Sequence, residues 1–291
     1  MTLTESGAIC DPLQQQCELS AASFARLAQF ITAEVGIKMP ESKTMMIQSR
    51  LLRRVNSLGL ASMDEYVDRL FAPQNEAERE HFINAITTNK TDFFREPEHF
   101  SYLSEVVLPA FGGGRAHCTR FHAWSAGCST GEEPHTLAMV LAEYGARRPG
   151  FDFAILATDV STKVLDQARD AIYTEAQILP VPPELRRKYL LSSRGGEERV
   201  ARIVPGLRMR ISFGQLNFMD EYYPVKDTFD VIFFRNVMIY FDRPTQEAVV
   251  NKLCRNLTPG GYLFAGHSES LAGLDIPLRP VKASIYRKEG R

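Results

Sequence analysis

The sequence predicts an α/β protein with a doubly wound, mostly parallel sheet, an inserted antiparallel β-subdomain and a small all-α domain at its start. Three observations lead to this fold class. Residues 20–75 show only helical periodicity, and strand-like segments then alternate with helical ones. A stretch around Gly195-Gly196 breaks that alternation. With 291 residues, 44% of them hydrophobic, the chain is long enough for a large and a small domain.

The helical domain is expected over residues 20–75, after a loose polar arm at residues 1–19. Apolar side chains recur there at helical spacing, and Gly59 follows the second helix as a stop signal. The expected helices contain Phe24–Ile31, Glu41–Leu58 and Asp64–Phe71. We expect the second domain at residues 76–291, because the polar and acidic residues 73–80 are typical of a linker.

The second domain is expected to contain the parallel sheet, because helical segments separate most of its strand candidates. These candidates are Arg120–Ser125, Phe153–Thr158, Ile211–Leu216, Asp230–Phe234 and Tyr262–Ala265. The antiparallel insertion is expected over residues 192–213, where Gly195-Gly196 and Pro205-Gly206 separate short apolar segments.

Composition and charge exclude several classes of protein. Lys and Arg number 34 against 35 Asp and Glu, so we expect no nucleic-acid partner. No apolar run approaches the roughly 18 residues of a membrane span, and the start lacks a secretory signal, so we expect a cytoplasmic protein without direct membrane insertion. The five cysteines form neither a CxxC pair nor a cluster with histidine, which predicts no metal site and no disulfide framework.

Ligands of an open parallel sheet bind beyond the carboxyl ends of its strands. The first strand runs into small residues at Trp124–Pro134, which let a ligand approach the backbone, with a tight strand-to-helix turn as the alternative. Asp159 follows the second strand, where a carboxylate can hold a ribose or cap the next helix. Because the first loop lacks the G-x-G-x-x-G that seats a pyrophosphate, an adenosine cofactor without phosphates fits it better than a dinucleotide.

Two further strand ends carry polar residues. Asn217 and Phe218 follow the third strand, as the hydrogen-bonding and packing partners of an adenine or as an ordinary turn and core pair. Arg235 and Asn236 follow the apolar run of the fourth strand, where burial without partners is costly. We therefore expect both of these residues to belong to a site.

Residues Thr87–Glu96 combine many side-chain donors with a phenylalanine pair and Arg95. A capped helix start explains the threonines and the asparagine, but not an arginine after two aromatic residues. We therefore expect a lid over the cofactor, with Arg95 pointing to a carboxylate.

Together these residues resemble those of the CheR-type chemoreceptor glutamate methyltransferases, from about Phe24 to about Tyr286. Four motifs carry the resemblance: TTNKTDFFRE at Thr87–Glu96, WSAGCSTGEEP at Trp124–Pro134, FRNVMIYFD at Phe234–Asp242 and GHSE at Gly266–Glu269. The resemblance implies a Rossmann-like methyltransferase fold and S-adenosylmethionine as cofactor. It also implies glutamate side chains of bacterial chemoreceptors as substrates, with glutamate methyl esters and S-adenosylhomocysteine as products.

The resemblance further implies a role for individual residues. S-adenosylmethionine would be covered by Asn89, Thr91 and Arg95, with its amino-acid portion facing Glu133 and its ribose held by Asp159. Its adenine would be bordered by Asn217 and Phe218. Its methionine end would lie near Arg235 and Asn236, and Tyr240 would line the methyl-transfer site.

The chemistry of such a transfer requires positioning rather than proton removal. A glutamate carboxylate has an unperturbed pKa of about 4.3 and is ionised at neutral pH, so it needs no general base. The enzyme must align the carboxylate oxygen with the methyl carbon and the sulfur, and it must exclude water. Arg95, Arg235 and Tyr240 are our candidates for these catalytic tasks.

On the second N-terminal helix, Lys43, Arg50 and Arg54 fall within roughly 20° of one line at about 100° per residue, with Arg53 beside them. The candidates for receptor docking are Arg50, Arg53 and Arg54. They form either a solvated basic face or a docking surface. The resemblance implies an acidic helical bundle as the receptor's methylation region, which favours docking. In some family members the β-subdomain grips a short peptide at the receptor C-terminus, so that peptide is a candidate partner. We expect a monomer.

Three other functions compete with this one. Asn236 is followed by Val237-Met238-Ile239 rather than the Pro-Pro-aromatic of amino-methylating enzymes, which disfavours a nucleic-acid methyltransferase. A small-molecule methyltransferase needs neither a basic N-terminal domain nor a β insertion. The alternative from another class is a catalytically silent S-adenosylmethionine-sensing module that binds receptors, and turnover distinguishes it from an enzyme.

Overall fold

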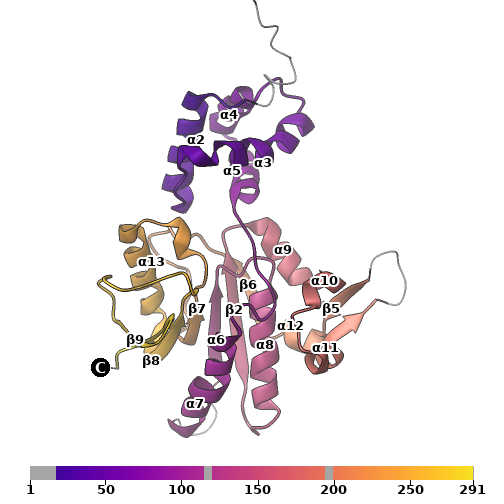
Figure 1. Ribbon diagram of the computed structural model, residues 1–291, viewed down its shortest axis with the longest axis vertical. Helices are drawn as coiled ribbons and strands as arrows, with labels where there is room; N and C mark the ends of the chain where they lie inside the picture. The colour runs from indigo at the N-terminus through magenta and orange to yellow at the C-terminus, as the bar shows by residue number, and fades with distance from the viewer. Residues whose placement is uncertain (1–17, 115–119, 194–198, 291) are drawn as a thin grey trace, which may run out of the picture. The chain divides into compact units, whose positions relative to one another are not determined.

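The computed structural model describes residues 18–114, 120–193 and 199–290, so most of the predicted arm at 1–19 lies outside the described residues. The chain forms two compact units, Met1–Thr88 and Asn89–Arg291, and each is described by itself (Figure 1). Within the described ranges, none of the helices has both the length and the apolar character needed to cross a membrane.

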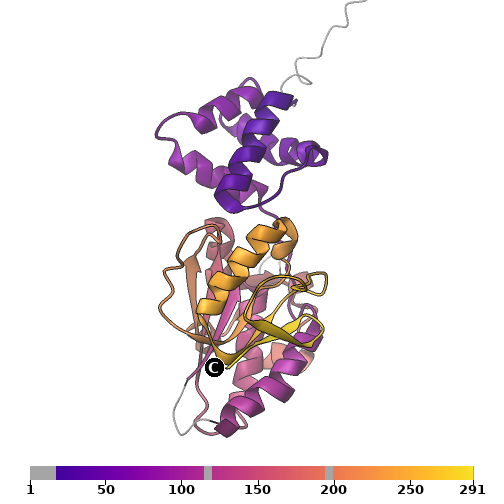
Figure 2. The same ribbon diagram turned by 90° about the vertical axis from the view of Figure 1, so that its left-hand side faces the viewer.

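In its described residues, 18–88, the first unit contains helices and no strand, as predicted (Figure 2). It contains α2 (Ala21–Val35), the short 3₁₀ helix η1 (Glu41–Lys43), α3 (Thr44–Ser57), α4 (Met63–Phe71) and α5 (Glu76–Ile86). The Ser20 and Ser62 side chains cap α2 and α4 by accepting backbone N–H groups. Each of the four α-helices contributes a fully buried side chain to the core, namely Leu27, Leu51, Tyr66 and Phe82.

The two units divide between Thr88 and Asn89, whereas the sequence placed the boundary between residues 75 and 76. The difference is due to α5, whose acidic start is typical of a linker but whose apolar side packs into the helical unit. Phe82 of α5 is fully buried, and Glu78 forms an ion pair of 2.6 Å with Arg54 of α3. Helix α5 therefore completes the first unit.

The second unit contains a seven-stranded sheet in the order β6-β2-β1-β7-β8-β10-β9 (Figure 1). Its strands are β1 (Phe121–Ala126), β2 (Phe153–Asp159), β6 (Ile211–Gln215), β7 (Phe229–Phe233), β8 (Leu257–Phe264), β9 (Leu278–Lys282) and β10 (Ile285–Lys288). The first five in spatial order pair in parallel, and β10 is antiparallel to both of its neighbours. The doubly wound, mostly parallel sheet is confirmed, while β9 and β10 were not predicted.

Helices follow the parallel strands and cover the sheet. These are α8 (Glu132–Gly145) after β1, α9 (Thr162–Asp170) after β2 and α13 (Arg243–Arg255) after β7, and a run of α6 (Pro97–Tyr102), the π-helix η2 (Leu103–Val107) and α7 (Leu108–Gly114) precedes β1. The chain winds from β1 toward β6 and then returns to β7 on the other side of β1. Because such crossovers are right-handed, α8 and α9 cover one face and α13 the other. The reversal between β1 and β7 marks the crevice where ligands bind.

The inserted β-subdomain is a three-stranded antiparallel sheet in the order β3-β5-β4. It contains β3 (Ile172–Thr174), α10 (Glu175–Ile178), α11 (Pro183–Tyr189), β4 (Leu190–Ser192), β5 (Val200–Ile203) and α12 (Pro205–Arg208). It is larger than the predicted insertion at 192–213, because it begins at β3, and Ile211 already belongs to the main sheet. Strand β3 has three residues and no distinct turn signal before it, so its sequence does not mark this start. Gly195-Gly196 lies outside the described residues.

Candidate active site

The loop after β1 is shaped by two glycines with left-handed backbone, Gly127 (φ 87°) and Gly131 (φ 95°). A Cβ on Gly127 would lie 2.6 Å from Val237 Cγ2, and one on Gly131 would lie 2.8 Å from Ala168 Cβ. Both positions therefore require glycine. The loop is a tight strand-to-helix turn that packs closely against the segment after β7 and against α9.

The β-subdomain contacts this loop through hydrogen bonds. Tyr173 Oη donates to the Thr130 carbonyl (2.9 Å), and Thr130 Oγ1 donates to Glu132 Oε2 (2.6 Å). Gln177 Nε2 donates to the other oxygen of Glu132 (3.3 Å). Burial raises the pKa of Glu132 despite these donors. The loop and the subdomain are thus joined by a short polar chain.

Asp159, the last residue of β2, is buried at 8% exposure. Its Oδ2 accepts the Ser129 N–H (2.9 Å) and its Oδ1 accepts the Ser161 N–H (3.0 Å). Burial raises the pKa of Asp159, and these N–H donors oppose the shift. The cap of α9 is Ser161, whose Oγ accepts the Val164 N–H, so Asp159 is not merely the cap of that helix.

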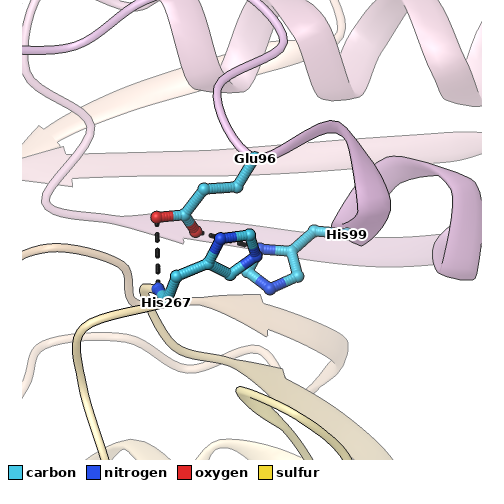
Figure 3. A group of neighbouring side chains, drawn as sticks. All are labelled: Glu96, His99 and His267. Atoms are coloured by element: carbon cyan, nitrogen blue, oxygen red, sulfur yellow. Dashed lines mark hydrogen bonds and ion pairs between the residues drawn. The ribbon is translucent and has the colours of Figure 1, made fainter.

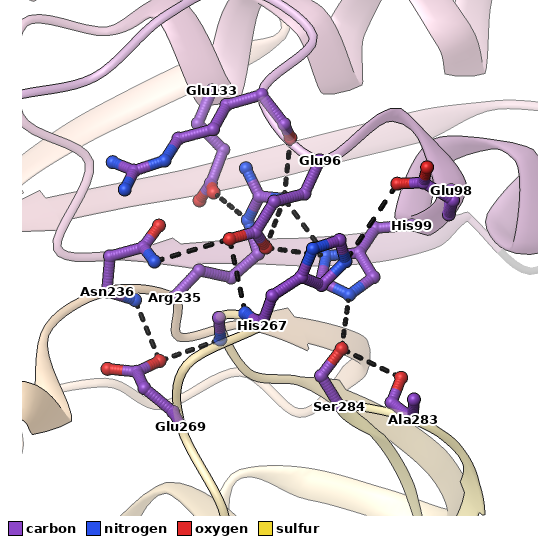
Figure 4. A network of polar contacts seen from close by, with 12 residues as sticks. Glu96, Glu98, His99, Glu133, Arg235, Asn236, His267, Glu269, Ala283 and Ser284 are labelled. Carbon is purple, nitrogen blue, oxygen red and sulfur yellow. Dashed lines mark hydrogen bonds and ion pairs between the residues drawn. The ribbon is translucent and has the colours of Figure 1, made fainter.

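Arg235, directly after β7, and Glu133, in the first turn of α8, form a buried ion pair with 2.7 Å between Nε and Oε2. Ser125 Oγ donates to Oε1 of the same carboxylate (2.7 Å). Arg235 Nη1 donates to the Arg95 carbonyl (2.8 Å). It also donates to His99 Nδ1 (2.9 Å; Figure 4). The buried arginine therefore has partners from three separate segments of the chain.

Glu96 joins the segment predicted to be a lid to the ends of two strands. Its Oε1 accepts Nδ2–H of Asn236 (3.3 Å) and the His267 N–H (3.1 Å), and its Oε2 lies 3.4 Å from Arg235 Nη1. Burial alone would raise the pKa of Glu96, but the His267 N–H and the Arg235 charge outweigh it and lower this pKa. Glu96 is therefore an ionised partner of the site that the sequence did not single out.

Glu269 of the GHSE motif fixes the loop after β7. Its Oε2 accepts the N–H groups of Gly266 (2.7 Å) and Asn236 (2.8 Å), and its Oε1 accepts that of Ile239 (3.3 Å). Asn236 has a left-handed backbone (φ 60°), and a Cβ on Gly266 would lie 2.4 Å from its Nδ2. The sequence marked this motif but gave Glu269 no role.

Residues of the predicted lid lie beside the first loop. Ser129 Oγ donates to the Asn89 carbonyl (2.9 Å), and Arg95 Nη1 donates to the Lys90 carbonyl (2.9 Å). Thr91 is half-buried. The Arg95 side chain thus bonds to its own segment, while its backbone carbonyl holds Arg235.

The predicted adenine and methyl-transfer residues lie at the same end of the sheet. Asn217 Oδ1 accepts the Met219 N–H (3.0 Å), and the Phe218 ring packs edge-on against Phe234 with 5.0 Å between centroids. Tyr240 is half-buried and ends the short 3₁₀ helix η3 (Met238–Tyr240). The strand ends thus gather the predicted groups as the topology requires.

Glu96, His99 and His267 form a cluster whose donor atoms lie within 4.8 Å of one another (Figure 3). A metal ion here would lie close to Arg235, whose Nη1 is 2.9 Å from His99 Nδ1 and 3.4 Å from Glu96 Oε2. Two cations at that separation repel each other. The guanidinium is therefore the cation that these groups hold, and the absence of a metal site stays a prediction.

The three arginines predicted to dock a receptor have different surroundings within the helical unit. Arg50 donates to the Thr87 carbonyl (3.1 Å), and Arg54 binds Glu78 through both Nε (3.0 Å) and Nη2 (2.6 Å). Arg53 is exposed. Helical spacing could not reveal the carbonyl and the carboxylate that engage two of them, and the docking role of the three arginines stays a prediction.

The groups at the strand ends suit S-adenosylmethionine. The loop after β1 contains glycines at which a Cβ would clash, and a buried acid ends β2. A buried ion pair joins the first turn of α8 to the residue after β7. This sheet order and site define an α/β methyltransferase that uses S-adenosylmethionine. Residues 22–87 match the family model described as CheR methyltransferase, all-alpha domain, and residues 89–287 match CheR methyltransferase, SAM binding domain. The chain belongs to the CheR methyltransferase family.

Curated relatives agree with this assignment. A chemotaxis protein methyltransferase of Salmonella typhimurium is 39% identical over 262 residues, which cover 90% of this chain and 88% of the relative. One of Borreliella burgdorferi is 39% identical over 267 residues, covering 91% and 93% respectively. One of Escherichia coli is 37% identical over 263 residues, covering 90% and 89%. The similarity thus extends over both units.

Proposed function

We propose that this protein transfers the methyl group of S-adenosylmethionine to glutamate side-chain carboxylates of bacterial chemoreceptors, as part of chemotactic adaptation in the cytoplasm. The products are glutamate methyl esters and S-adenosylhomocysteine. The observation that carries the proposal is the match of both units to one family of methyltransferases, over residues 22–87 and 89–287. The relatives named above are chemotaxis protein methyltransferases, which supports a chemoreceptor as substrate.

Cofactor binding is assigned to the residues gathered at the strand ends: Asn89, Thr91, Arg95, Glu133, Asp159, Asn217, Phe218, Arg235 and Asn236. In this assignment Glu133 and Asp159 accept hydrogen bonds from the amino group and the ribose, respectively. Both carboxylates are buried and already held by protein donors, Glu133 by Arg235 and Asp159 by two N–H groups. Because these acceptors are already held in place, ligand binding does not have to include the entropic cost of ordering them.

The residues of the site would act by orientation. When bound, the cofactor supplies a methyl group on a sulfonium, which a carboxylate attacks directly. Arg95 and Tyr240 are proposed to position the substrate carboxylate. Arg235 acts at the same place by holding the Arg95 carbonyl and the Glu133 carboxylate in fixed positions. No proton has to be removed, so alignment and exclusion of water provide the acceleration.

Two surfaces are proposed to contact the receptor. Arg53 is the exposed member of the basic helix face and would meet the acidic receptor bundle, whereas Arg50 and Arg54 support the same face from within. In the β-subdomain, β3 and β4 are the edge strands and expose Ile172 (50%) and Leu191 (53%). An extended receptor C-terminal peptide can add to such an edge. We further propose that the protein acts as a monomer.

The test is to incubate the protein with methyl-labelled S-adenosylmethionine and receptor-containing bacterial membranes. Label on the receptor band that mild base releases as methanol is the expected result, because carboxyl methyl esters are base-labile. Membranes without chemoreceptors are the matched control and should take up no such label. Measurable cofactor binding without receptor label would instead favour the catalytically silent sensing module.

A further inference from the structure

His99 lies at the centre of the polar network around Arg235 (Figure 4). It is on α6, and its side chain is 1% exposed. Its Nδ1 is 2.9 Å from Arg235 Nη1, and its Nε2 is 2.8 Å from Ser284 Oγ in the turn between β9 and β10. Both ring nitrogens are therefore engaged, one by the ion pair of the site and one by the C-terminal hairpin.

These contacts fix where the ring carries its hydrogen. A guanidinium donates hydrogen bonds and has no acceptor, so Nδ1 must accept from Arg235 and carries no hydrogen. The hydrogen of the neutral ring is then on Nε2, which donates to Ser284 Oγ. Ser284 Oγ in turn donates to the Ala283 carbonyl (2.7 Å), which completes a chain of donors in one direction.

The charges around His99 keep the ring neutral at neutral pH. Burial is the largest cause, and together with the nearby charges of Arg235, His267 and Lys282 it lowers the pKa of His99 to about 4. Glu96, with Oε2 at 3.4 Å from Nδ1, acts in the opposite direction but does not outweigh them. A protonated ring would also lose the acceptor that Arg235 uses.

We propose that His99 is a positioning residue for Arg235 and acts through it on Glu133. Nη1 of Arg235 has two hydrogens, and the Arg95 carbonyl and His99 Nδ1 are its two closest acceptors. With Nη1 held by both, the guanidinium plane is fixed, and Nε is directed to Glu133. Without the His99 acceptor, a buried N–H loses its partner and the plane can turn. The inference rests on the proposed cofactor role of Glu133.

Two substitutions test the contacts of the two ring nitrogens one at a time. In His99→Asn, the amide oxygen can take the place of Nδ1 and accept from Arg235. In His99→Gln, the amide takes the place of Nε2, so the contact to Ser284 is kept and the acceptor for Arg235 is lost. A merely structural role would make the two variants equally impaired, because both remove the aromatic ring from its contact with Phe264 (5.6 Å between centroids).

The experiment measures S-adenosylhomocysteine affinity by calorimetry, and KM and kcat for receptor methylation, on the full chain. We expect His99→Gln to weaken affinity by about tenfold, which corresponds to roughly 1.4 kcal/mol. His99→Asn should recover most of that loss, with Ser284→Ala as a further variant of intermediate effect. Equal losses in the Asn and Gln variants would overturn the proposal.

Nitrogen–proton correlation spectra of the wild-type ring provide a readout that needs no variant. They should show a neutral ring with its hydrogen on Nε2 at neutral pH, and a hydrogen on Nδ1 would overturn the proposal. Affinity for S-adenosylhomocysteine is measured without a receptor. If the wild type bound it, and the Gln variant bound it more weakly than the Asn variant, His99 would retain its assignment even if no receptor were methylated.

Discussion

Glu133 and Arg235 are 102 residues apart in the sequence and form a buried ion pair of 2.7 Å that ties the start of α8 to the end of β7. Removing one partner of such a pair leaves a buried, unpaired charge, which costs about 3–5 kcal/mol. We expect Glu133→Ala to lower the free energy of unfolding by that amount in urea titrations and to abolish cofactor binding. Asp166→Ala is the control, because the Asp166–Arg169 pair is exposed and is worth less than about 1 kcal/mol. Equal losses in both variants would contradict this role of the buried pair.

Tyr240 is predicted to act on turnover rather than on cofactor binding. If its hydroxyl positions the substrate carboxylate, Tyr240→Phe should lower kcat by about tenfold to a hundredfold and leave S-adenosylhomocysteine affinity nearly unchanged. Tyr222→Phe is the matched control, because Tyr222 is 71% exposed. A large loss of cofactor affinity in Tyr240→Phe would refute the assignment.

Alanine substitutions at Gly127 and Gly150 distinguish the energetic cost of backbone strain from that of steric contact. Both have nearly the same φ, 87° and 86°, but a Cβ at Gly127 would lie 2.6 Å from Val237 Cγ2, while nothing lies within 4 Å at Gly150. Gly150→Ala should cost only the strain of a left-handed alanine, about 1–2 kcal/mol. Gly127→Ala should cost more and should also weaken cofactor binding, as thermal unfolding and calorimetry can measure. Similar behaviour of the two variants would rule out the close approach at Gly127.

Arg53 is predicted to be needed for the receptor and not for the cofactor. Because it is exposed, Arg53→Glu should leave folding intact, raise KM for receptor about tenfold at low salt and lose much of this effect at high salt. Lys38→Glu makes the same charge change at another exposed position of the helical unit. Equal effects of both reversals would indicate a general charge effect instead of docking.

Acid should weaken the fold through two buried histidines. Burial lowers the pKa of His99 and of His135 to about 4, from an ordinary value of 6.5. The unfolded chain therefore binds more protons between these two pH values, so the free energy of unfolding falls as the pH drops through this window. The loss approaches about 3 kcal/mol per histidine at the acidic end. In urea titrations across this pH window, the free energy of unfolding should fall less steeply with decreasing pH for His99→Asn than for the wild type. Identical slopes of this free energy against pH would contradict the contribution of His99.

Local patterns in the sequence predicted the helical unit and the five parallel strands. Hydrophobic periodicity is a local property, so it found β1 and β7 but not β9, whose residues are mostly exposed. It also could not assign α5 to the helical unit, because the partner of the buried Glu78 is Arg54, 24 residues away.

The candidate site was predicted through its strand ends, and its connections were not. Arg235 and Glu133 were named, but His99 was missed, since it meets Arg235 across 136 residues and its neighbours show no pattern that marks it. Likewise, the spacing of Arg50 and Arg54 indicated a shared face but not the acceptors that occupy it. Which polar groups meet is decided by the topology of the sheet and not by distance along the chain.

The hydrogen bond from Tyr173 to the Thr130 carbonyl makes the β-subdomain and the loop after β1 thermodynamically linked parts. A ligand that tilts the subdomain must either stretch this bond or carry the loop with it. By reciprocity, any change it causes in cofactor affinity is matched by an equal effect of the cofactor on that ligand's affinity. If a receptor were bound through the β-subdomain, its affinity for the enzyme would then depend on whether S-adenosylmethionine is bound.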